Sequence, residues 1–374
     1  MRILHWSEVF WPYIGGAQTS GLKLLLGLQN RKHECIVVTS HGDQDLPDMD
    51  MVQGIPVYRF PFNTALANHD PHQLLTTRKR VAELKRQFAP DLIHINCFGS
   101  SVFFHLETTT SYPSRLLVTL RGERFPPPDQ PHTLLGRTLR NADFVTAPSM
   151  RTIEYARQLL PDFSLPSYHI YNGMDFPALD PQPLPTDLPK LLCLGRLVPN
   201  KGFDLAITGF ASITEQFPQA RLVIAGEGPE RARLEKQSDQ LGIKEKITFI
   251  GSVDSKHVPE LINTATIVVI PSRGWEALPL VALEAGLMGR PVVAARDGGL
   301  PEVVIHGETG MLVDKEDSRG LAQALSFLLS HPHKADQMGK AARNRVQTDF
   351  SMDRCVNEYE RLCQNLIKQT APLR

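Results

Sequence analysis

Short apolar runs alternate with longer amphipathic segments along almost the whole chain. Arg2–Trp6, Cys35–Thr39 and Leu92–Ile95 have the length and composition of buried strands. The segments from Gly16 to about Gln29 and Thr77–Phe88 have the spacing of amphipathic helices. Because strands divided by helices predict a parallel sheet covered on both faces, the expected fold class is α/β. Further strands are expected at Val57–Phe60, Leu116–Leu120, Phe144–Ala147 and Tyr168–Ile170.

The proline-rich segment Phe176–Pro189 interrupts this alternation near the middle of the chain. Proline fixes φ and removes a backbone donor, so the segment predicts a linker and a hinge rather than a helix or strand. The alternation then restarts, which predicts two doubly wound domains that form a cleft, with ligands at the carboxyl ends of the strands. The expected ranges are 1–176, the linker 177–189, 190–352, and a terminal helical segment 353–374. Strands in the second half are expected at Lys190–Leu194, Leu222–Ala225, Ile247–Ile250, Ile267–Ile270, Val292–Ala294 and Met311–Val313.

Composition agrees with a two-domain globular protein and excludes several function classes. The chain has 374 residues, 42% apolar, which exceeds the size at which one core stops growing. Forty basic residues balance forty acidic ones, which argues against nucleic acid as a partner. The five cysteines form no CxxC pair, so neither disulfides nor a zinc site are expected. With no apolar leader and no run long enough to span a bilayer, we expect a cytoplasmic protein, with docking at the inner membrane face left open.

Two cations and two carboxylates follow strands in the second half. Arg196 and Lys201 come directly after Lys190–Leu194, and a guanidinium with an ammonium on one loop suits a diphosphate. Glu276 follows Ile267–Ile270, and Glu284 lies in the helix that Pro279 opens. Carboxylates of this kind suit the hydroxyls of a sugar, so the set favours a sugar-nucleotide site. The alternative is two solvated cations, an exposed loop acid and an ordinary helix acid.

The motifs around these residues resemble glycosyltransferase family 4. GRLVPNKG, GEGPE, GWEALPLVALEA, GGLPEVV and HGETGMLV occur in the order of that family, and PYIGGAQTSGL and YNGMD in the first half are similar to it. The resemblance covers nearly the whole chain. It implies a GT-B fold of two Rossmann-like domains, with the acceptor bound mainly by the first and the donor by the second. It also implies metal-independent transfer with retention, no cofactor, and a last helix that crosses back to the first domain.

The resemblance also assigns residue roles. Arg196 and Lys201 would hold the donor diphosphate, Glu276 the sugar hydroxyls and Glu284 the ribose. The amide of Gly16, next to Gly15, would contact phosphate. The donor site would be completed by Ala277, Leu278, Pro279 and Leu280.

One family feature is missing from the first half. Relatives place a histidine after a strand to touch the sugar, whereas here Asn96 and Arg121 stand at those positions and His94 lies inside a strand. We expect His94 to be a packed strand residue. Arg121 is either a substitute sugar contact or a partner of Glu123. Asn96, Arg121 and Asn172 are therefore the candidate sugar or acceptor contacts, and Pro61–Thr76 and Arg121–Pro131 the candidate acceptor loops.

Three further signals are interpreted as structural. Gly226-Glu227-Gly228 resembles a dinucleotide fingerprint, but Arg231 replaces its third glycine, so NAD is not expected. Asp48-Met49-Asp50 resembles a metal-binding DxD, but its Asp- and Pro-rich surroundings indicate a solvated turn. The basic cluster is interpreted as a wet helix face, with an anionic membrane or phosphate-rich acceptor as the alternative. That cluster consists of Arg78, Lys79, Arg80, Lys85 and Arg86.

The predicted activity is transfer of a sugar from a nucleotide-diphosphate sugar to a hydroxyl of a glycan, a lipid-linked or a small-molecule acceptor. Two alternatives belong to other classes. A non-catalytic sugar-nucleotide sensor would keep the second-half motifs without acceptor chemistry, and an epimerase would convert the donor alone.

Overall fold

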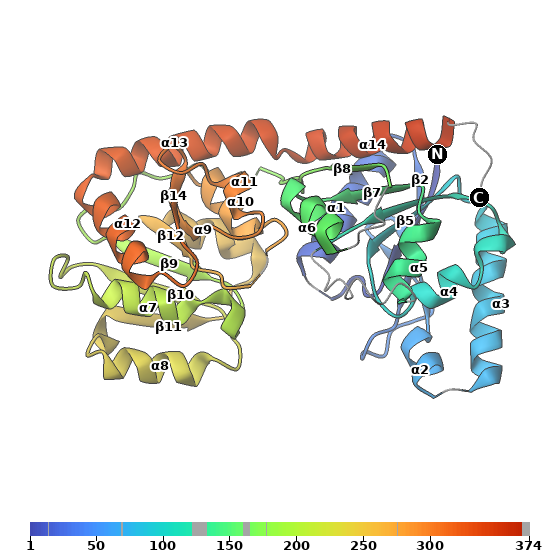
Figure 1. The fold of residues 1–374 in the computed structure, drawn as a ribbon, viewed down its shortest axis with the longest axis horizontal. Coiled ribbons are helices and arrows are strands. Elements are labelled where there is room, and N and C mark those ends of the chain that lie inside the picture. The colour runs from blue at the N-terminus through green and yellow to red at the C-terminus, as the bar shows by residue number, and fades with distance from the viewer. Residues whose placement is uncertain are drawn as a thin grey trace. The chain divides into compact units, whose positions relative to one another are not determined.

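This computed structural model describes residues 1–13, 15–68, 70–121, 133–159, 165–176, 178–274 and 276–368. The chain forms two compact units, each with its own mostly parallel sheet and helices (Figure 1). Unit 1 comprises Met1–Gly173 with Met352–Arg374, and unit 2 comprises Met174–Ser351. The expected α/β class with two Rossmann-like sheets is confirmed.

Unit 1 is built on an eight-stranded sheet with the order β3-β4-β2-β1-β5-β6-β7-β8. Neighbouring strands are parallel except β3 with β4. In β1, Leu4 and Trp6 enter one apolar cluster and Ile3 the other, because successive side chains point to opposite faces. The strands are β1 (Arg2–Ser7), β2 (Glu34–Ser40), β3 (Met49–Val52), β4 (Ile55–Phe60), β5 (Leu92–Cys97), β6 (Arg115–Thr119), β7 (Phe144–Ala147) and β8 (Ser167–His169). The helices are α1 (Gly16–Asn30), α2 (Phe62–Ala67), α3 (Pro71–Phe88), α4 (Val102–Leu106), α5 (Leu134–Asn141), α6 (Met150–Leu159) and α14 (Met352–Lys368).

Unit 2 has a six-stranded sheet with the order β11-β10-β9-β12-β13-β14, in which every neighbouring pair is parallel. Its central strands β9, β12 and β13 are almost wholly apolar, as expected where both faces are covered. The strands are β9 (Lys190–Leu194), β10 (Arg221–Ala225), β11 (Ile247–Gly251), β12 (Ile267–Ile270), β13 (Val292–Ala295) and β14 (Gly310–Val313). The helices are α7 (Phe203–Ala211), α8 (Arg231–Gln240), α9 (Val258–Asn263), α10 (Leu280–Leu287), α11 (Leu300–Val303), α12 (Ser318–Ser330) and α13 (Pro332–Asp349).

The proline-rich segment is not a free linker, because it is bound to unit 2. The buried guanidinium of Arg290 donates to the carbonyl of Gln182 at 2.8 Å, and Asn263 Nδ2 donates to the carbonyl of Asp180 at 2.9 Å. Thr266 Oγ1 donates to the carbonyl of Pro185 at 2.7 Å. The chain passes between the units at Gly173–Met174 and Ser351–Met352 instead. Bending between Asp180 and Pro185 would break these bonds, whereas the hinge expected within Phe176–Pro189 stays a prediction.

Helix α14, near the C-terminus of the chain, packs on unit 1. Tyr359 is buried, and its hydroxyl lies 3.3 Å from Thr119 Oγ1 on β6. At the surface, Arg31 at the end of α1 bonds Glu360 at 2.8 Å and Asp353 at 2.6 Å. The interface of α14 with unit 1 therefore combines a buried aromatic side chain with charged contacts to the end of α1.

Three local expectations in unit 1 are corrected by the structure. Met49 and Asp50 lie in the edge strand β3 rather than in a turn, because the run Met49–Val52 pairs antiparallel with β4. The candidate loop Pro61–Thr76 is mostly helical: α2 occupies 62–67, and α3 begins at Pro71, six residues earlier than expected. Asp70 caps that start by accepting from the amide of His72, and proline suits the first helical position.

The basic face of α3 is also only partly exposed to solvent. Arg78, Lys79 and Arg86 are exposed, but Lys85 is fully buried. Its Nζ lies 3.3 Å from His105 Nδ1 and donates to the carbonyls of His105 and Thr108 at 3.2 and 3.3 Å. Among the described helices, none is both long enough and apolar enough to cross a bilayer.

Candidate functional site

Lys201 and Glu276, which are far apart in sequence, meet in unit 2. Lys201 ends the short 3₁₀ turn after β9, and Glu276 lies in the loop after β12, the neighbouring strand. Lys201 Nζ lies 2.5 Å from Glu276 Oε1, and the buried Ser272 Oγ donates to the same oxygen at 3.0 Å. The two side chains are 26% and 19% exposed. The pair is therefore held in place while still reachable by a ligand.

The backbone of Glu276 is fixed by the loop after β13. The amide of Gly299 donates to the carbonyl of Glu276 at 2.7 Å. Gly298 has φ +55, and a Cβ there would lie 2.4 Å from the same carbonyl oxygen. Only glycine meets both requirements, since the conformation is left-handed and the space is filled by backbone. The two glycines of the GGLPEVV motif thus fix the backbone position of Glu276.

Arg196 presents an exposed side chain from a rigid loop. The amides of Gly195 and Leu197 donate to the carbonyls of Ala225 and Glu227 at 3.0 and 2.8 Å. In the part of the chain that the structure describes, no hydrogen bond or ion pair occupies its guanidinium. Among the described residues, Arg196 forms no hydrogen bond or ion pair with Lys201 or Glu276, so Lys201 and Glu276 are the predicted donor residues that the structure shows bonded to each other.

Gly226 explains the apparent dinucleotide fingerprint. It has φ +143, and a Cβ there would lie 1.9 Å from the carbonyl oxygen of Gly195. Glycine is required because the β10 loop presses against the Arg196 loop. The position of Arg231 fits this interpretation, since its side chain bonds Glu235 at 2.9 Å and also pairs with Glu227.

The remaining donor positions connect Glu276 to α10. Pro279 is the N-cap residue of this helix, with φ −75 and ψ 115, and Leu280 is its first residue. Leu278 is buried, and a Cβ on Gly299 would lie 2.2 Å from the carbonyl oxygen of Ala277. Glu284 is half-buried in the middle of α10. This segment is tightly packed, which fixes the spacing between the two glutamates.

Asn96, Arg121 and Asn172 come together in unit 1. Arg121 Nη2 and Nη1 donate to Asn96 Oδ1 and Asn172 Oδ1, both at 2.5 Å. Asn96 Nδ2 in turn donates to the carbonyl of Ala17 on α1 at 3.1 Å. Three residues that sequence reasoning chose separately thus form one cluster at the carboxyl ends of β5 and β6. Glu123 and the rest of the candidate loop up to Pro131 lie outside the described residues.

His94 is a packed strand residue, as expected. It is 3% exposed, and its Nε2 lies 2.7 Å from Thr119 Oγ1. Burial, then the nearby His5 and Arg121, keep its pKa well below the ordinary value. Its neighbour His5 is fully buried, and burial followed by the charge of Arg121 lowers its pKa to about 3. Both rings are neutral near pH 7, so neither supplies a cation.

Gly15 and Gly16 stand at the start of α1 in unit 1. Gly15 is the N-cap residue with extended backbone, no side chain caps the helix, and its first turn carries no acid. The amides of this 15-residue helix therefore face outward with the positive end of the helix dipole. This arrangement suits a phosphate, and the role expected for Gly16 stays a prediction.

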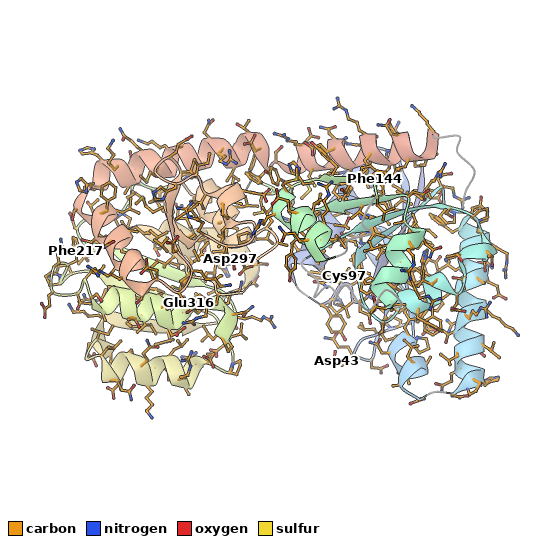
Figure 2. The ribbon with its side chains drawn as sticks, viewed as in Figure 1. Asp43, Cys97, Phe144, Phe217, Asp297 and Glu316 are labelled. Atoms are coloured by element: carbon orange, nitrogen blue, oxygen red, sulfur yellow. The ribbon has the colours of Figure 1, made fainter. Side chains whose placement is uncertain are left out.

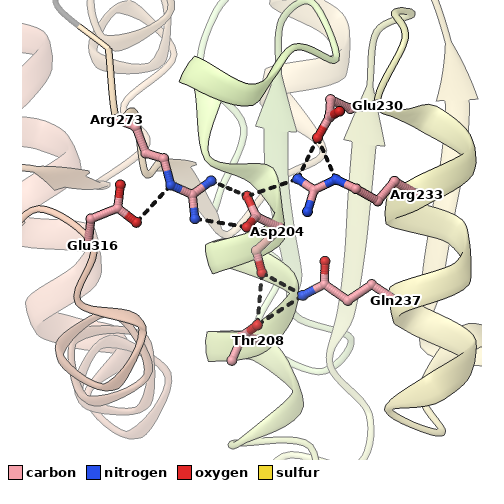
Figure 3. A network of polar contacts seen from close by, with 7 residues as sticks. All are labelled: Asp204, Thr208, Glu230, Arg233, Gln237, Arg273 and Glu316. Atoms are coloured by element: carbon pink, nitrogen blue, oxygen red, sulfur yellow. Dashed lines mark hydrogen bonds and ion pairs between the residues drawn. The ribbon is translucent and has the colours of Figure 1, made fainter.

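Three charged residues that sequence reasoning did not select form a network beside the Lys201–Glu276 pair. Arg273 contacts Asp204 and Glu316, as Figure 3 shows, and Figure 2 labels Glu316 in the loop after β14. Arg273 immediately precedes the motif GWEALPLVALEA, and Asp204 is three residues after Lys201. Their positions in the sequence do not reveal that the side chains of Arg273 and Asp204 meet. Among the described residues, no three His, Cys, Asp or Glu side chains gather as a metal-binding group.

Comparison with known families decides the classification. Residues 14–176 match the model described as Glycosyltransferase Family 4, and residues 177–345 match the one described as Glycosyl transferases group 1. The two matches adjoin and together cover most of the chain. The chain belongs to the family 4-type glycosyltransferases.

Solved glycosyltransferase structures share its GT-B fold. A sucrose-phosphate synthase from Thermosynechococcus elongatus superposes with a TM-score of 0.81 at 23% identity, covering 98% of this chain and 99% of that one. Anabaena HepE in complex with UDP gives 0.80 at 21% identity, covering 98% and 100%. These identities are low enough that the likeness concerns the fold.

Two curated relatives illustrate the range within this glycosyltransferase family. A GDP-mannose-dependent alpha-(1-6)-phosphatidylinositol monomannoside mannosyltransferase from Mycolicibacterium smegmatis is 33% identical over 57% of this chain and 59% of its own length. An N-acetyl-alpha-D-glucosaminyl L-malate synthase from Bacillus anthracis is 25% identical over 96% of both chains. For the more similar relatives, the matched region spans about half of their length.

Proposed function

We propose that this family member transfers a sugar from a nucleotide-diphosphate sugar to an acceptor hydroxyl, with retention at the anomeric carbon and without a metal ion. The observation that carries the proposal is the Lys201–Glu276 pair at the carboxyl ends of β9 and β12. An ammonium suits the diphosphate, and a carboxylate suits the sugar hydroxyls. The family membership supports the same assignment.

The chemistry requires a cation where the leaving group develops charge. As the bond between the anomeric carbon and the diphosphate oxygen breaks, negative charge grows on that oxygen. Lys201 and the exposed Arg196 would stabilise this charge because both are fixed before reaction by their loops. The acceptor oxygen bonds to the anomeric carbon from the same face, and its proton passes to the departing diphosphate. Glu276 would hold the sugar through its hydroxyls during this step.

We assign the acceptor mainly to unit 1. The Asn96–Arg121–Asn172 cluster offers amide and guanidinium groups at the carboxyl edge of its sheet, and these groups suit sugar hydroxyls. The exposed Arg78, Lys79 and Arg86 on α3 suit an anionic surface, which extends the proposal to peripheral contact with a membrane. The phosphatidylinositol-linked acceptor named for the mycobacterial relative supports a lipid-linked acceptor.

The leaving-group role is tested with Arg196→Ala and Lys201→Ala in the full chain. The donor is first chosen by thermal-shift screening against UDP-, GDP- and ADP-sugars. Each substitution should then lower kcat about 10²- to 10³-fold, as for removal of one preorganised donor to a developing oxyanion. Lys244→Ala is the matched control, since Lys244 is exposed elsewhere in unit 2. Unchanged turnover in both variants would remove the proposed role.

The same assays separate the transferase from its two alternatives. Slow hydrolysis of the donor without an acceptor supports an enzyme, whereas tight nucleotide binding without turnover for any acceptor supports a sensor. An epimerase would change the donor alone, which the NMR spectrum of the product reveals. The relatives carry transferase and synthase names, so they do not favour either alternative.

A further inference from the structure

Arg273 connects the loop that carries Glu276 to two other loops of unit 2 (Figure 3). It lies three positions before Glu276, between β12 and α10. Its two terminal nitrogens contact both carboxylate oxygens of Asp204, with Nη2 2.8 Å from Oδ2, and Nε donates to Glu316 Oε2 at 2.7 Å. A guanidinium fork on a carboxylate fixes orientation as well as distance.

The two carboxylates come from separate strand ends. Asp204 lies in the first turn of α7, three residues after Lys201, and Glu316 lies between β14 and α12. Glu316 has φ +63, a left-handed conformation that is unfavourable for a residue other than glycine. Such a backbone persists only where the surroundings hold it, and the ion pair with Arg273 is one such contact. Arg273 thus joins three loops at one edge of the sheet.

Backbone contacts place the same loop directly against the Lys201 turn. The amides of Arg273 and Gly274 both donate to the carbonyl of Asn200, at 2.8 and 2.9 Å. Asn200 immediately precedes Lys201. A shift of Arg273 would therefore move the Glu276 loop relative to the Lys201 turn, and with it the contact between the two side chains.

Within this network, the carboxylate of Asp204 is paired with the guanidinium of Arg273. Burial opposes ionisation of Asp204, but the Arg273 guanidinium outweighs it and lowers the pKa of that carboxyl below its usual value. Arg273 and Asp204 are 24% and 17% exposed, so water screens their interaction only partly.

We propose that Arg273 is a positioning residue for the donor site, because it fastens the Glu276 loop to the α7 and α12 loops so that Glu276 meets Lys201. The claim that this loop binds a sugar-nucleotide donor rests on the proposed function. The claim that Arg273 holds the loop in place does not.

The fastening is tested without any ligand by amide hydrogen exchange in the full chain. Arg273→Ala should raise exchange in the peptide covering 271–274 at least tenfold. Arg233→Ala is the matched control, because Arg233 also approaches Asp204, at 3.9 Å, but comes from α8 with a 54% exposed side chain. That variant should leave exchange within twofold of the parent. Equal exchange in Arg273→Ala and the parent would overturn the inference.

The effect on the donor is tested by steady-state kinetics with the UDP-, GDP- or ADP-sugar that the parent chain turns over. Arg273→Ala should lower kcat/KM about 10- to 100-fold, the size expected when a reacting group is displaced by about 1 Å. Arg273→Lys keeps one of the two carboxylate contacts and should recover part of the loss. In a Lys201→Ala background, Arg273→Ala should cost less than threefold, because it acts through that pair.

The kinetic outcomes separate this inference from the proposed function. A lower melting temperature with unchanged kcat/KM would mean that Arg273 is only structural and would overturn the positioning role. If the parent chain turns over none of the three donors, the proposed function fails, and the exchange measurement still decides whether Arg273 holds the loop.

Discussion

Replacing Lys85 with methionine should make unit 1 more stable, and most strongly at low pH. The Lys85 side chain is fully buried, and among the described residues it contacts no carboxylate. Burial lowers its pKa from 10.5 to about 7. His105 does not balance the charge, because burial followed by the charge of Lys85 keeps the pKa of that ring well below its ordinary value.

The magnitude follows from proton linkage. Between pH 7 and pH 10.5 the folded chain holds Lys85 neutral, whereas the unfolded chain holds it charged, so unfolding takes up a proton and stability rises with pH. Below pH 7 the lysine is charged in both states, and the full penalty applies. At about 1.4 kcal/mol per pKa unit, the lowering of the Lys85 pKa from 10.5 to about 7 corresponds to a loss of about 5 kcal/mol in the free energy of unfolding. Between pH 6 and pH 9 the penalty should fall by about 3 kcal/mol.

Methionine fills similar volume without a charge and leaves no carbonyl stranded. The carbonyls of His105 and Thr108 also accept the amides of Thr108 and Ser111, at 3.1 and 3.2 Å. We therefore expect the Lys85→Met variant to gain several kcal/mol over the parent at pH 6 and about 3 kcal/mol less than that at pH 9.

The assay is guanidinium unfolding at pH 6 and pH 9, followed by tryptophan fluorescence. Trp6 reports on the site, since its ring lies 5.9 Å from Lys85 Nζ, and a Trp11→Phe, Trp275→Phe background isolates its signal. Arg86→Met, the exposed neighbour on α3, is the control and should show little pH-dependent difference. A difference between Lys85→Met and the parent that does not change with pH would refute the reasoning.

Three further outcomes are expected. Arg290→Ala should destabilise unit 2 by about 3–5 kcal/mol in denaturant unfolding, because it strands the buried carbonyl of Asn263 and removes the donor to the carbonyls of Ile262 and Gln182; a loss below about 1 kcal/mol would contradict this. Gly298→Ala should lower kcat at least tenfold with the folded spectrum retained, because its Cβ would meet the Glu276 carbonyl at 2.4 Å; parental kcat would be inconsistent with that clash. Because the proposed leaving-group charge is met by side chains, dialysis against EDTA should leave turnover within twofold; a loss restored by Mg²⁺ would show a metal requirement.

The fold could be predicted from sequence because its strands are short, apolar and regularly spaced. Phe144–Ala147, Lys190–Leu194 and Ile267–Ile270 were expected with the bounds that β7, β9 and β12 have. Edge strand β3 was missed, since Met49–Val52 alternates too weakly and sits among aspartates and prolines. Lys85 was misassigned because the sequence shows a basic run but not that helix α4, through His105, covers one member of it.

Individual site residues could be chosen from sequence, but their contacts could not. The strand-end rule placed Lys201 and Glu276 correctly, and the topology then made them neighbours. Arg273 and Asp204 were passed over because charged residues in loops are common, and only the folded register shows a bidentate pair. Proline content predicted a linker at Phe176–Pro189, yet proline removes donors without removing carbonyl acceptors. Thr266 donates to one such carbonyl, that of Pro185, and Arg290 donates to the carbonyl of Gln182, so the segment is bound to unit 2.

The crystal structure of the full chain with its nucleotide-diphosphate sugar tests the central claim most directly. We expect the diphosphate to lie within hydrogen-bond distance of Lys201 Nζ and Arg196, with a sugar hydroxyl on the Glu276 carboxylate. A diphosphate bound away from both cations, with Lys201 and Glu276 still paired and untouched, would contradict it.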